Sequence, residues 1–292
     1  MSKYVPDVLT HRWVIISSHR VNRPEDTDKT KKNKCVFCPG NEHLTPNESY
    51  RLGKGEKDSP GWKIRAIPNK YPITDTHEVI IHSPEDDRDI DTLPLLQVEM
   101  LLMAYRDRYN YFRKRGQVLI FCNHGESSGA SLTHPHSQLV VIPSQINLDT
   151  LTREPLTNIV DTNSFFYQYC PDFSQWPYEV WIAPKKEDTY FGDISSEEIK
   201  DLAQIMQKTL RNLKKISQHR NLYMKNFAYN YYIYPKENWY LRIIPRLIHR
   251  AGFELGTGLS VNVVDPYEAS LELKGMDEKM SNVMRRLKKY RQ

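Results

Sequence analysis

The sequence contains no apolar run that approaches the roughly 20 residues of a membrane-spanning helix. The N-terminal stretch MSKYVPDVLTHRWVIISS also lacks the succession of basic, apolar and small residues that marks a secretion signal. Cysteine is scarce, because the 292 residues include only four, which does not suggest a disulfide framework. These absences argue against a membrane protein and favour a protein of the reducing cytoplasm.

A strong charge of one sign is also missing. Lys and Arg number 41 against 36 Asp and Glu, which gives a formal net charge of +5. So small an excess does not predict nucleic-acid binding, whereas a ligand that carries phosphates would suit it. The length of 292 residues and the hydrophobic content of 39% allow a sizeable core, in one large domain or in two of ordinary size, of which we expect two.

Short β-branched runs bounded by Pro, Gly, Asn or Asp predict strands in both halves of the chain. In the first half they cover Arg12–Ser18, His77–Ser83, Gln117–Cys122 and Gln138–Pro143, all expected in one sheet. In the second half they cover Phe165–Tyr169, Tyr178–Pro184, Phe227–Tyr234 and Trp239–Pro245. Each set is interrupted by one long segment with apolar residues at helical spacing.

These two segments predict helices. The first, Thr92–Arg115, follows a possible cap at Asp91 or Thr92 and is expected to cross the sheet. The second opens with Ser195 and Glu198 at the spacing of a capping box. Its apolar face comprises Ile199, Leu202, Met206, Leu210 and Leu213.

Strands and helix thus occur twice in a similar order, which favours a tandem duplication of an α+β unit. The join is expected between Pro143 and Glu154, and gives an N-terminal unit over residues 1–145 and a C-terminal unit over 146–292. An amphipathic helix over Met276–Tyr290, packed on the body of the protein, is expected to follow the last strands.

Cys35 and Cys38 lie in the sequence CVFCPGNE, where a tight turn can bring both thiolates to one zinc ion. Two ligands do not complete a tetrahedron, so the others must come from elsewhere. The candidates are His43, His77, His82, Asp86 and His134. Since there is no second CxxC pair, the alternative stays open that the two cysteines are inert or redox-active.

The segment FCNHGESSGASLTHPHSQ, Phe121 to Gln138, begins with the end of a strand and continues as a loop of small residues. Gly125 and Gly129 keep side chains out of the way, so that backbone N–H groups can reach phosphate oxygens. Hydroxyls that can do the same belong to Ser127, Ser128, Ser131 and Thr133. The loop therefore predicts a phosphate site.

This loop leads into two histidines. Alternation along a strand places His134, His136 and Gln138 on one face. A neutral imidazole whose tautomer is fixed by a hydrogen bond is a good nucleophile toward phosphorus, and its product can pass a nucleotide onward. The alternative is a pair of hydrogen-bonded histidines at a strand end, which the adjoining loop and the glutamine in phase disfavour.

Two other segments suit a phosphorylated ligand. Arg20 and Arg23 can offer two guanidinium groups from one loop, although residues in such a charged loop are more often simply solvated. The sequence IPNKYPI, Ile67 to Ile73, offers an amide, an ammonium group and an aromatic ring for a base or a ribose.

The motifs VLTHRWVIISSHRVNRP, CVFCPGNEHLTP, NKYP, FCNHGESSGASLTHPHSQ and AGFELGTG resemble those of the galactose-1-phosphate uridylyltransferase family, in the same order. This family is the transferase branch of the histidine-triad superfamily. The resemblance implies two tandem histidine-triad-like α+β units, each a mostly antiparallel sheet with a crossing helix. It implies that His136 becomes nucleotidylated and that Gln138 hydrogen-bonds the transferred phosphate. The residues that it assigns to substrate binding are Arg20, Arg23, Asn69, Asn123, Gly129 and Ser131.

The family's zinc site pairs the two cysteines with two histidines. The second histidine matches His134, whereas the place of the first holds Asp86, whose carboxylate can also bind zinc. The second half departs further, because Asn238 and Tyr240 stand where many relatives have a His-x-His pair. The resemblance therefore implies a degenerate C-terminal unit and one zinc ion, held by Cys35, Cys38, Asp86 and His134.

The leading hypothesis is an enzyme that moves a nucleoside monophosphate, UMP before others, between a nucleotide sugar and a hexose 1-phosphate through a nucleotidyl-histidine. The AGFELGTG segment looks closer to plant ADP-glucose phosphorylase, which would transfer an adenylyl group to phosphate. A histidine-triad hydrolase is disfavoured, because such enzymes tend to have a third histidine at the place of Gln138. A non-catalytic nucleotide-binding protein is the remaining alternative. The family also implies a possible homodimer.

Overall fold

The structure is a computed structural model that describes residues 2–7, 12–22, 34–148, 151–219 and 227–275. Its strands are β1 (Lys3–Pro6), β2 (Trp13–Ile16), β3 (Tyr50–Gly53), β4 (Trp62–Pro68), β5 (His77–Ile81), β6 (Gln117–His124), β7 (His136–Ile142), β8 (Ile159–Thr162), β9 (Phe166–Tyr169), β10 (Val180–Pro184), β11 (Tyr229–Ile233) and β12 (Leu241–Pro245). Its helices are α1 (Leu95–Phe112), α2 (Ser196–His219), α3 (Gly252–Thr257) and α4 (Pro266–Leu273), with short 3-10 helices η1 (Ser18–Asn22), η2 (Glu42–Leu44), η3 (Glu126–Ser128) and η4 (Phe191–Asp193).

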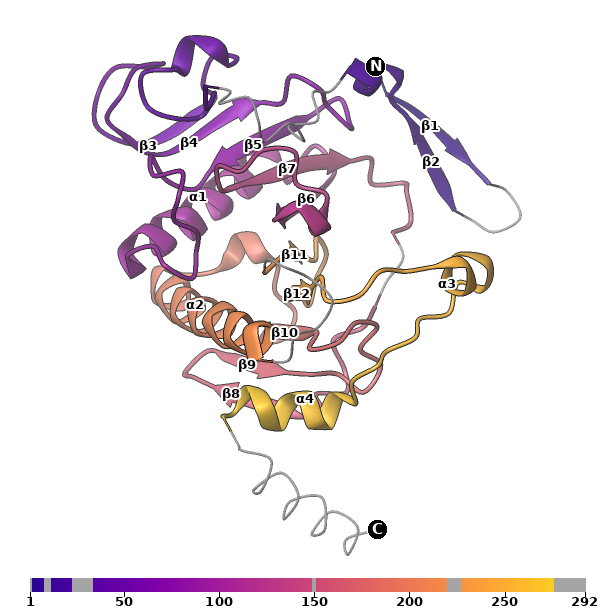
Figure 1. The fold of residues 1–292 in the computed structure, drawn as a ribbon. Coiled ribbons are helices and arrows are strands. Elements are labelled where there is room, and N and C mark those ends of the chain that lie inside the picture. The colour runs from indigo at the N-terminus through magenta and orange to yellow at the C-terminus, as the bar shows by residue number, and fades with distance from the viewer. Residues whose placement is uncertain (1, 8–11, 23–33, 149–150, 220–226, 276–292) are drawn as a thin grey trace, which may run out of the picture.

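Ten strands form one continuous antiparallel sheet in the order β3-β4-β5-β7-β6-β11-β12-β10-β9-β8. The helices α1 and α2 pack against one another on the same face of this sheet (Figure 1). Their apolar side chains form the main hydrophobic core together with alternate residues of the strands, such as Ile120, Leu139 and Ile243. The opposite face of β5 and β7 carries the polar side chains of the candidate site.

The two halves of the sheet have the same topology. In the N-terminal half, β3, β4 and β5 form a meander, α1 crosses the sheet, and β6 is followed by β7, which pairs beside β5. In the C-terminal half, β8 to β10, α2, β11 and β12 repeat this order. The halves meet where β6 pairs with β11, with Cys122 opposite Tyr231. The predicted α+β fold of two repeated units is confirmed, and the predicted join between residues 145 and 146 falls in the segment between β7 and β8.

The prediction that Arg12–Ser18 joins the large sheet is wrong. This segment contains β2, which pairs with β1 in a separate two-stranded hairpin (Figure 1). Its apolar side chains are not in the core, since Val14 is 58% exposed. A β-branched run marks a strand but does not say which sheet the strand enters, because that depends on distant partners.

Helix α1 begins later than predicted. It starts at Leu95, with Pro94 as its N-cap residue, rather than after a cap at Asp91 or Thr92. The carbonyl of Asp89 accepts the backbone N–H of Thr92 in a turn that precedes the helix. The residue before a proline is disfavoured in the helical conformation, so the helix cannot run continuously from Thr92.

The capping box predicted for α2 is confirmed. The Glu198 carboxylate accepts the backbone N–H of Ser195 at 2.7 Å, and the Ser195 hydroxyl accepts the backbone N–H of Glu198 at 3.1 Å. The five residues of the predicted apolar face are buried. None of the helices in the described ranges is long and apolar enough to cross a membrane. The helix predicted over Met276–Tyr290 lies outside the described residues.

Candidate nucleotide-binding site

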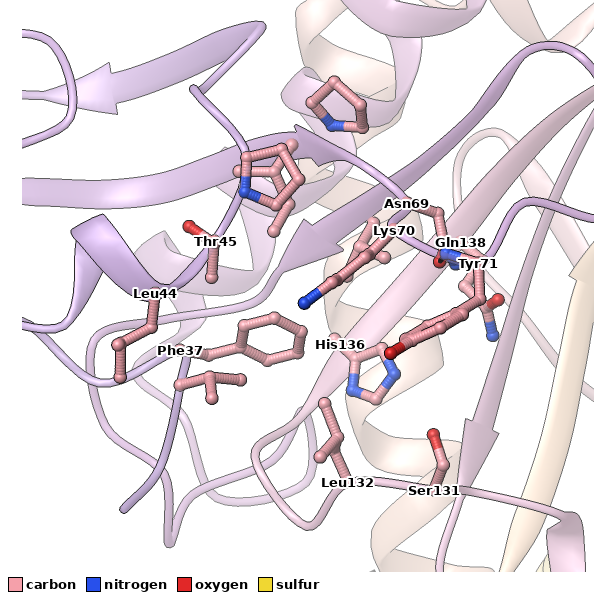
Figure 2. A pocket seen from close by; sticks show the side chains of 15 residues that line it. Phe37, Leu44, Thr45, Asn69, Lys70, Tyr71, Ser131, Leu132, His136 and Gln138 are labelled. Carbon is pink, nitrogen blue, oxygen red and sulfur yellow. Dashed lines mark hydrogen bonds between the residues drawn. The ribbon is translucent and has the colours of Figure 1, made fainter. Parts of the chain in front are cut away.

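A pocket of about 210 Å³ opens beside β4, β5 and β7 (Figure 2). Four residues that the sequence assigned to the site line it: Asn69, Ser131, His136 and Gln138. Its apolar walls include Val36, Phe37, Leu44, Ile67, Val79 and Leu132. Figure 2 shows the Lys70 and Tyr71 side chains directed into the same space. Apolar walls with a few converging polar groups are typical of a small-molecule site.

His136, the first residue of β7, lies in this pocket with a fixed tautomer. Its Nδ1 atom is 2.8 Å from the carbonyl oxygen of His134. A carbonyl oxygen can only accept, so Nδ1 carries the proton and the lone pair is on Nε2. The ring of Phe37 stands edge-on to the imidazole, with centroids 5.4 Å apart. A ring nitrogen with such a lone pair is the atom through which a neutral histidine can act as a nucleophile.

Gln138 lies two residues further on the same face of β7 and contacts His77 of β5. The Oε1 atom of Gln138 is 3.0 Å from Nε2 of His77. The backbone N–H of Ile73 donates to Nδ1 of the same ring at 2.9 Å. Asn69 packs beside them, with its Nδ2 atom 3.1 Å from Nε2 of His77 and its Oδ1 atom accepting from the backbone of Tyr71. Two residues of the loop between β4 and β5, Asn69 and Ile73, therefore contact the His77 ring, and this ring contacts Gln138.

The two cysteines meet His134 at the edge of the pocket. The ligand atoms of Cys35, Cys38 and His134 all lie within 4.8 Å of one another. On the other side of its ring, His134 donates from Nε2 to the carbonyl of Ser83 at 2.8 Å, so the lone pair of Nδ1 faces the two thiols. Two soft thiols and an imidazole oriented by a carbonyl fit a zinc ion. These three residues can hold a metal ion.

Asp86 contacts this group from its exposed side, where its Oδ2 atom accepts from the Cys38 thiol at 3.4 Å. In the described residues it is not a member of the group whose ligand atoms all lie within 4.8 Å of one another. Burial raises the pKa of Cys35, but hydrogen bonds to His134 and Cys38 outweigh burial and lower it overall. Burial and the hydrogen bond to Cys35 raise the pKa of Cys38. The two thiols are therefore inequivalent, and Cys35 ionises first.

The glycine-containing loop after β6 is tied to the C-terminal unit. Asn230 of β11 donates from Nδ2 to Oδ1 of Asn123 at 2.8 Å and to the carbonyl of Ser128 at 3.0 Å. Gly129 ends η3 in the left-handed conformation, with φ of 81°. Of the three loop residues assigned to phosphate binding, Ser131 lines the His136 pocket, whereas Asn123 and Gly129 do not.

Arg20 lies in η1 and donates from an Nη atom to the carbonyl of Tyr71 at 2.5 Å. It therefore reaches the segment that forms one wall of the pocket. Arg23, its predicted companion in phosphate binding, lies outside the described residues.

The C-terminal unit has different side chains at the corresponding places. Arg242 of β12 lies between β10 and β11, as Gln138 lies between β5 and β6, and it forms a buried ion pair with Glu179 at 2.7 Å. Tyr240 precedes it by two residues and stacks on Trp181, with centroids 4.0 Å apart. An ion pair and an aromatic stack occupy these places, so the candidate site belongs to the N-terminal unit.

Sequence reasoning missed what Phe37 and His77 do. Phe37 lies between the two cysteines, and its ring contacts the imidazole of His136. His77 and His82 were considered only as possible zinc ligands, and the structure corrects both assignments. His77 contacts Gln138, and His82 is buried against Ser137, with 2.5 Å between Nε2 and Oγ. No local pattern could have revealed a contact between residues 61 positions apart.

This chain matches one protein-family model and shares its fold with a solved enzyme structure. A family model described as the N-terminal domain of DUF4931, a domain of unknown function, matches residues 16–145. The crystal structure of an ADP-glucose phosphorylase from Arabidopsis thaliana with bound ADP-glucose has the same fold, with a TM-score of 0.71. It is 25% identical in sequence and covers 95% of this chain and 100% of its own.

Two enzymes are similar to this chain in sequence over most of its length. An ADP-glucose phosphorylase of Arabidopsis thaliana is 27% identical over 90% of this chain and 90% of its own length. A galactose-1-phosphate uridylyltransferase of Thermotoga maritima is 25% identical over 91% of this chain and 96% of its own length. The chain is thus a homologue of both enzymes, and the resemblance found in its sequence is confirmed.

Proposed function

We propose that this protein is a nucleotidyltransferase that moves a nucleoside monophosphate from a nucleotide sugar to a phosphate-bearing acceptor through a covalent intermediate on His136. The observation that carries the proposal is the hydrogen bond from Nδ1 of His136 to the His134 carbonyl, which leaves the lone pair on Nε2. The relatives support the reaction class, since they are named for transfer or phosphorolysis of nucleotide sugars.

The reaction has two displacements at the same phosphorus atom. In the first, Nε2 of His136 attacks the α-phosphorus and forms an N–P bond, while the bond to the bridging oxygen breaks and hexose 1-phosphate leaves with the electron pair. In the second, an oxygen of the acceptor's phosphate attacks the same phosphorus and the electron pair returns to Nε2. The proton stays on Nδ1 of His136, hydrogen-bonded to the His134 carbonyl, so the imidazole carries positive charge only while it is nucleotidylated.

Polar groups around His136 would stabilise the charge on the phosphoryl oxygens. We assign this role to the Gln138 amide and the Ser131 hydroxyl, which line the pocket with His136. Asn123, Gly129, Arg20 and Arg23 are proposed to bind the remaining phosphate groups, and Asn69 the nucleoside. With substrate in the pocket, the apolar walls would exclude water and so favour transfer to the acceptor over hydrolysis.

Zinc is the metal that the two cysteines and His134 fit best, with Asp86 proposed as the fourth ligand. It would hold the segment of Cys35 to Cys38 against the start of β7. We assign it no part in the chemical step. The same segment carries Phe37, which contacts the ring of His136, so the metal would act on the position of the nucleophile.

UMP transfer to a hexose 1-phosphate and adenylyl transfer to inorganic phosphate are the two versions of this proposal. The second is favoured by the ADP-glucose phosphorylase relative and by its solved structure with ADP-glucose. The first is favoured by the relative from Thermotoga maritima, which covers the chain as completely. Both versions need the same nucleotidyl-histidine.

The test is incubation with UDP-glucose or ADP-glucose, followed by the intact mass of the protein. We expect the mass to rise by one nucleotidyl group with one of the two, and not to rise in His136→Ala. His219→Ala, which changes an exposed histidine at the end of α2, is the matched control and should still form the adduct. Adding galactose 1-phosphate, inorganic phosphate or water alone to the isolated adduct identifies the acceptor. An adduct that persists in His136→Ala, or none with either nucleotide sugar, would overturn the proposal.

A further inference from the structure

We infer that His77 is a positioning residue, which fixes the side-chain amide of Gln138 so that its NH2 group, and not its oxygen, faces the transferred phosphate. The inference rests on the proposed function for its consequence in the reaction. Its structural part, the direction of one hydrogen bond, can be tested without any reaction.

The direction of this hydrogen bond follows from the backbone. The N–H of Ile73 can only donate, and it lies 2.9 Å from Nδ1 of His77, so Nδ1 is the acceptor nitrogen of the neutral ring. The proton must then be on Nε2. The atom of Gln138 at 3.0 Å from Nε2 is therefore the acceptor oxygen Oε1, and the amide nitrogen points away from His77.

Asn69 makes the opposite orientation unfavourable. Its Oδ1 atom accepts from the backbone N–H of Tyr71 at 2.8 Å, so its Nδ2 atom is the one that lies 3.1 Å from Nε2 of His77. Because Nδ2 is a donor, Asn69 offers no acceptor to the Nε2 proton, and of the two amides it is that of Gln138, through Oε1, that accepts it. His77 and Gln138 are 4% and 5% exposed, so water does not compete readily for these groups.

The consequence concerns charge. A glutamine amide can present either an acceptor or two donors, and the two orientations differ by rotation of the terminal torsion. An oxygen directed at a phosphoryl group would repel it, whereas an N–H group stabilises the charge that the phosphoryl oxygens carry during transfer. Ile73, His77 and Gln138 thus form a relay in which a backbone N–H sets the polarity of a side chain in the pocket.

Two substitutions at His77 separate this role from simple packing. An asparagine has its terminal atoms near the place of Nδ1, so His77→Asn keeps the contact with Ile73 and loses the donor to Gln138. A glutamine reaches the place of Nε2, so His77→Gln keeps a donor to Gln138 and loses the contact with Ile73. A purely structural role predicts similar losses in both variants.

The first measurement is the single-turnover rate of nucleotidyl-enzyme formation with the nucleotide sugar that forms the adduct. We expect His77→Asn to slow the step about 10- to 100-fold, by analogy with the loss of a hydrogen-bond partner that orients a metal ligand, with little change in the substrate concentration that gives half the maximal rate. His77→Gln should restore most of the rate. The double variant His77→Asn with Gln138→Ala should be no slower than Gln138→Ala alone, since both changes act through one amide. Equal rates in the two His77 variants, or additive losses in the double variant, would refute the role.

The second measurement is nitrogen-15 NMR of the histidine rings and glutamine side chains without substrate. We expect His77 as the Nε2–H tautomer, and a shift of the Gln138 NH2 resonances in His77→Asn that is smaller in His77→Gln. An Nδ1–H tautomer at His77 would sink the inference even if the enzyme is active. If the wild-type protein forms no adduct with any nucleotide sugar, the proposed function falls, and the tautomer still decides the claim about His77.

Discussion

The carbonyl oxygen of His134 accepts a hydrogen bond from Nδ1 of His136 at 2.8 Å, while the imidazole of His134 faces the two cysteines. One residue therefore connects the candidate metal group with the candidate nucleophile. The connection is made through the backbone, so a displacement of the His134 ring shifts the carbonyl that fixes the tautomer of His136.

This relationship predicts that loss of the metal weakens the reaction without removing a reacting group. Cys35→Ser should reduce the metal content from about one ion per chain, lower the melting temperature and slow adduct formation at His136. Elemental analysis, thermal unfolding and intact mass measure the three effects.

The control for this prediction is Cys170→Ser. Cys170 is fully buried in the core and does not belong to the cysteine and histidine group. This variant should lose stability, because a hydroxyl replaces a thiol among apolar side chains, and should keep its metal. Metal-free wild-type protein with full activity would refute the role assigned to the metal.

A second prediction concerns the pH dependence of stability, through His124 at the end of β6. Its Nδ1 atom lies 2.9 Å from the buried carboxylate of Asp89, and its ring stacks on Tyr229. Burial lowers the pKa of His124, but the hydrogen bond and the charge of Asp89 raise it by more. The charge of Asp91 raises the pKa further, and the charge of Lys214 lowers it. The pKa of His124 is therefore above 6.5 overall.

The sign follows from linkage. A histidine with a raised pKa in the folded state stabilises the protein below its unfolded value of about 6.5, and this contribution is lost as the pH rises through the folded value. The free energy of unfolding should therefore exceed that of His124→Gln most near pH 5, and the difference should shrink above pH 6.5. Urea unfolding of both proteins at several pH values measures it. A difference that does not depend on pH would contradict the assignment.

Features that depend on residues close together in the sequence could be predicted from local sequence patterns. The capping box of Ser195 and Glu198 was predictable because both partners lie within one turn of α2. The strand β4 was not, because its sequence WKIRAIP places Arg65 where a core residue is needed. The guanidinium is fully buried and paired with Glu48 at 3.0 Å and Asp58 at 3.1 Å. Only the folded chain supplies these partners, so the sequence alone favours a solvated arginine.

The candidate site also has a part that the sequence predicts and a part that depends on how distant strands pair. The loop before β7 and the two histidines at or just before the start of this strand are contiguous in sequence, and their chemistry could be predicted from their spacing. The contact of Gln138 with His77 depends on the register of β5 and β7, which pairs Gln138 with Val79. Register is set by the packing of both strands in the whole sheet and not by either sequence alone.

A third prediction concerns the buried ion pair of the C-terminal unit. Arg242 binds both carboxylate oxygens of Glu179, at 2.7 and 2.9 Å. Arg242→Met should lower the free energy of unfolding by about 3–5 kcal/mol, because it leaves a buried carboxylate unpaired. Adding Glu179→Gln to this variant should recover part of the loss. Urea unfolding checks both, and a double variant that is less stable than Arg242→Met would contradict the account.

The last prediction compares two glycines of the loop before β7. Gly125 and Gly129 both have positive φ, 82° and 81°, so an alanine at either place should cost about 1–2 kcal/mol from backbone strain alone. They differ in their surroundings. A Cβ atom at Gly125 would lie 2.8 Å from the Cβ of Ala228, whereas one at Gly129 would meet nothing within 4 Å.

Gly125→Ala should therefore destabilise the protein more than Gly129→Ala, because it also forces β11 away from the loop. The loop is held to β11 by the bonds of Asn230 to Asn123 and Ser128, so this movement should also slow adduct formation at His136. Replacing Ala228 by glycine in the Gly125→Ala protein removes the contact and should restore part of the stability. Equal stability of Gly125→Ala and Gly129→Ala would mean that the loop moves away from Ala228 without loss of stability. The contacts of the loop with β11 would then not hold the site residues in position.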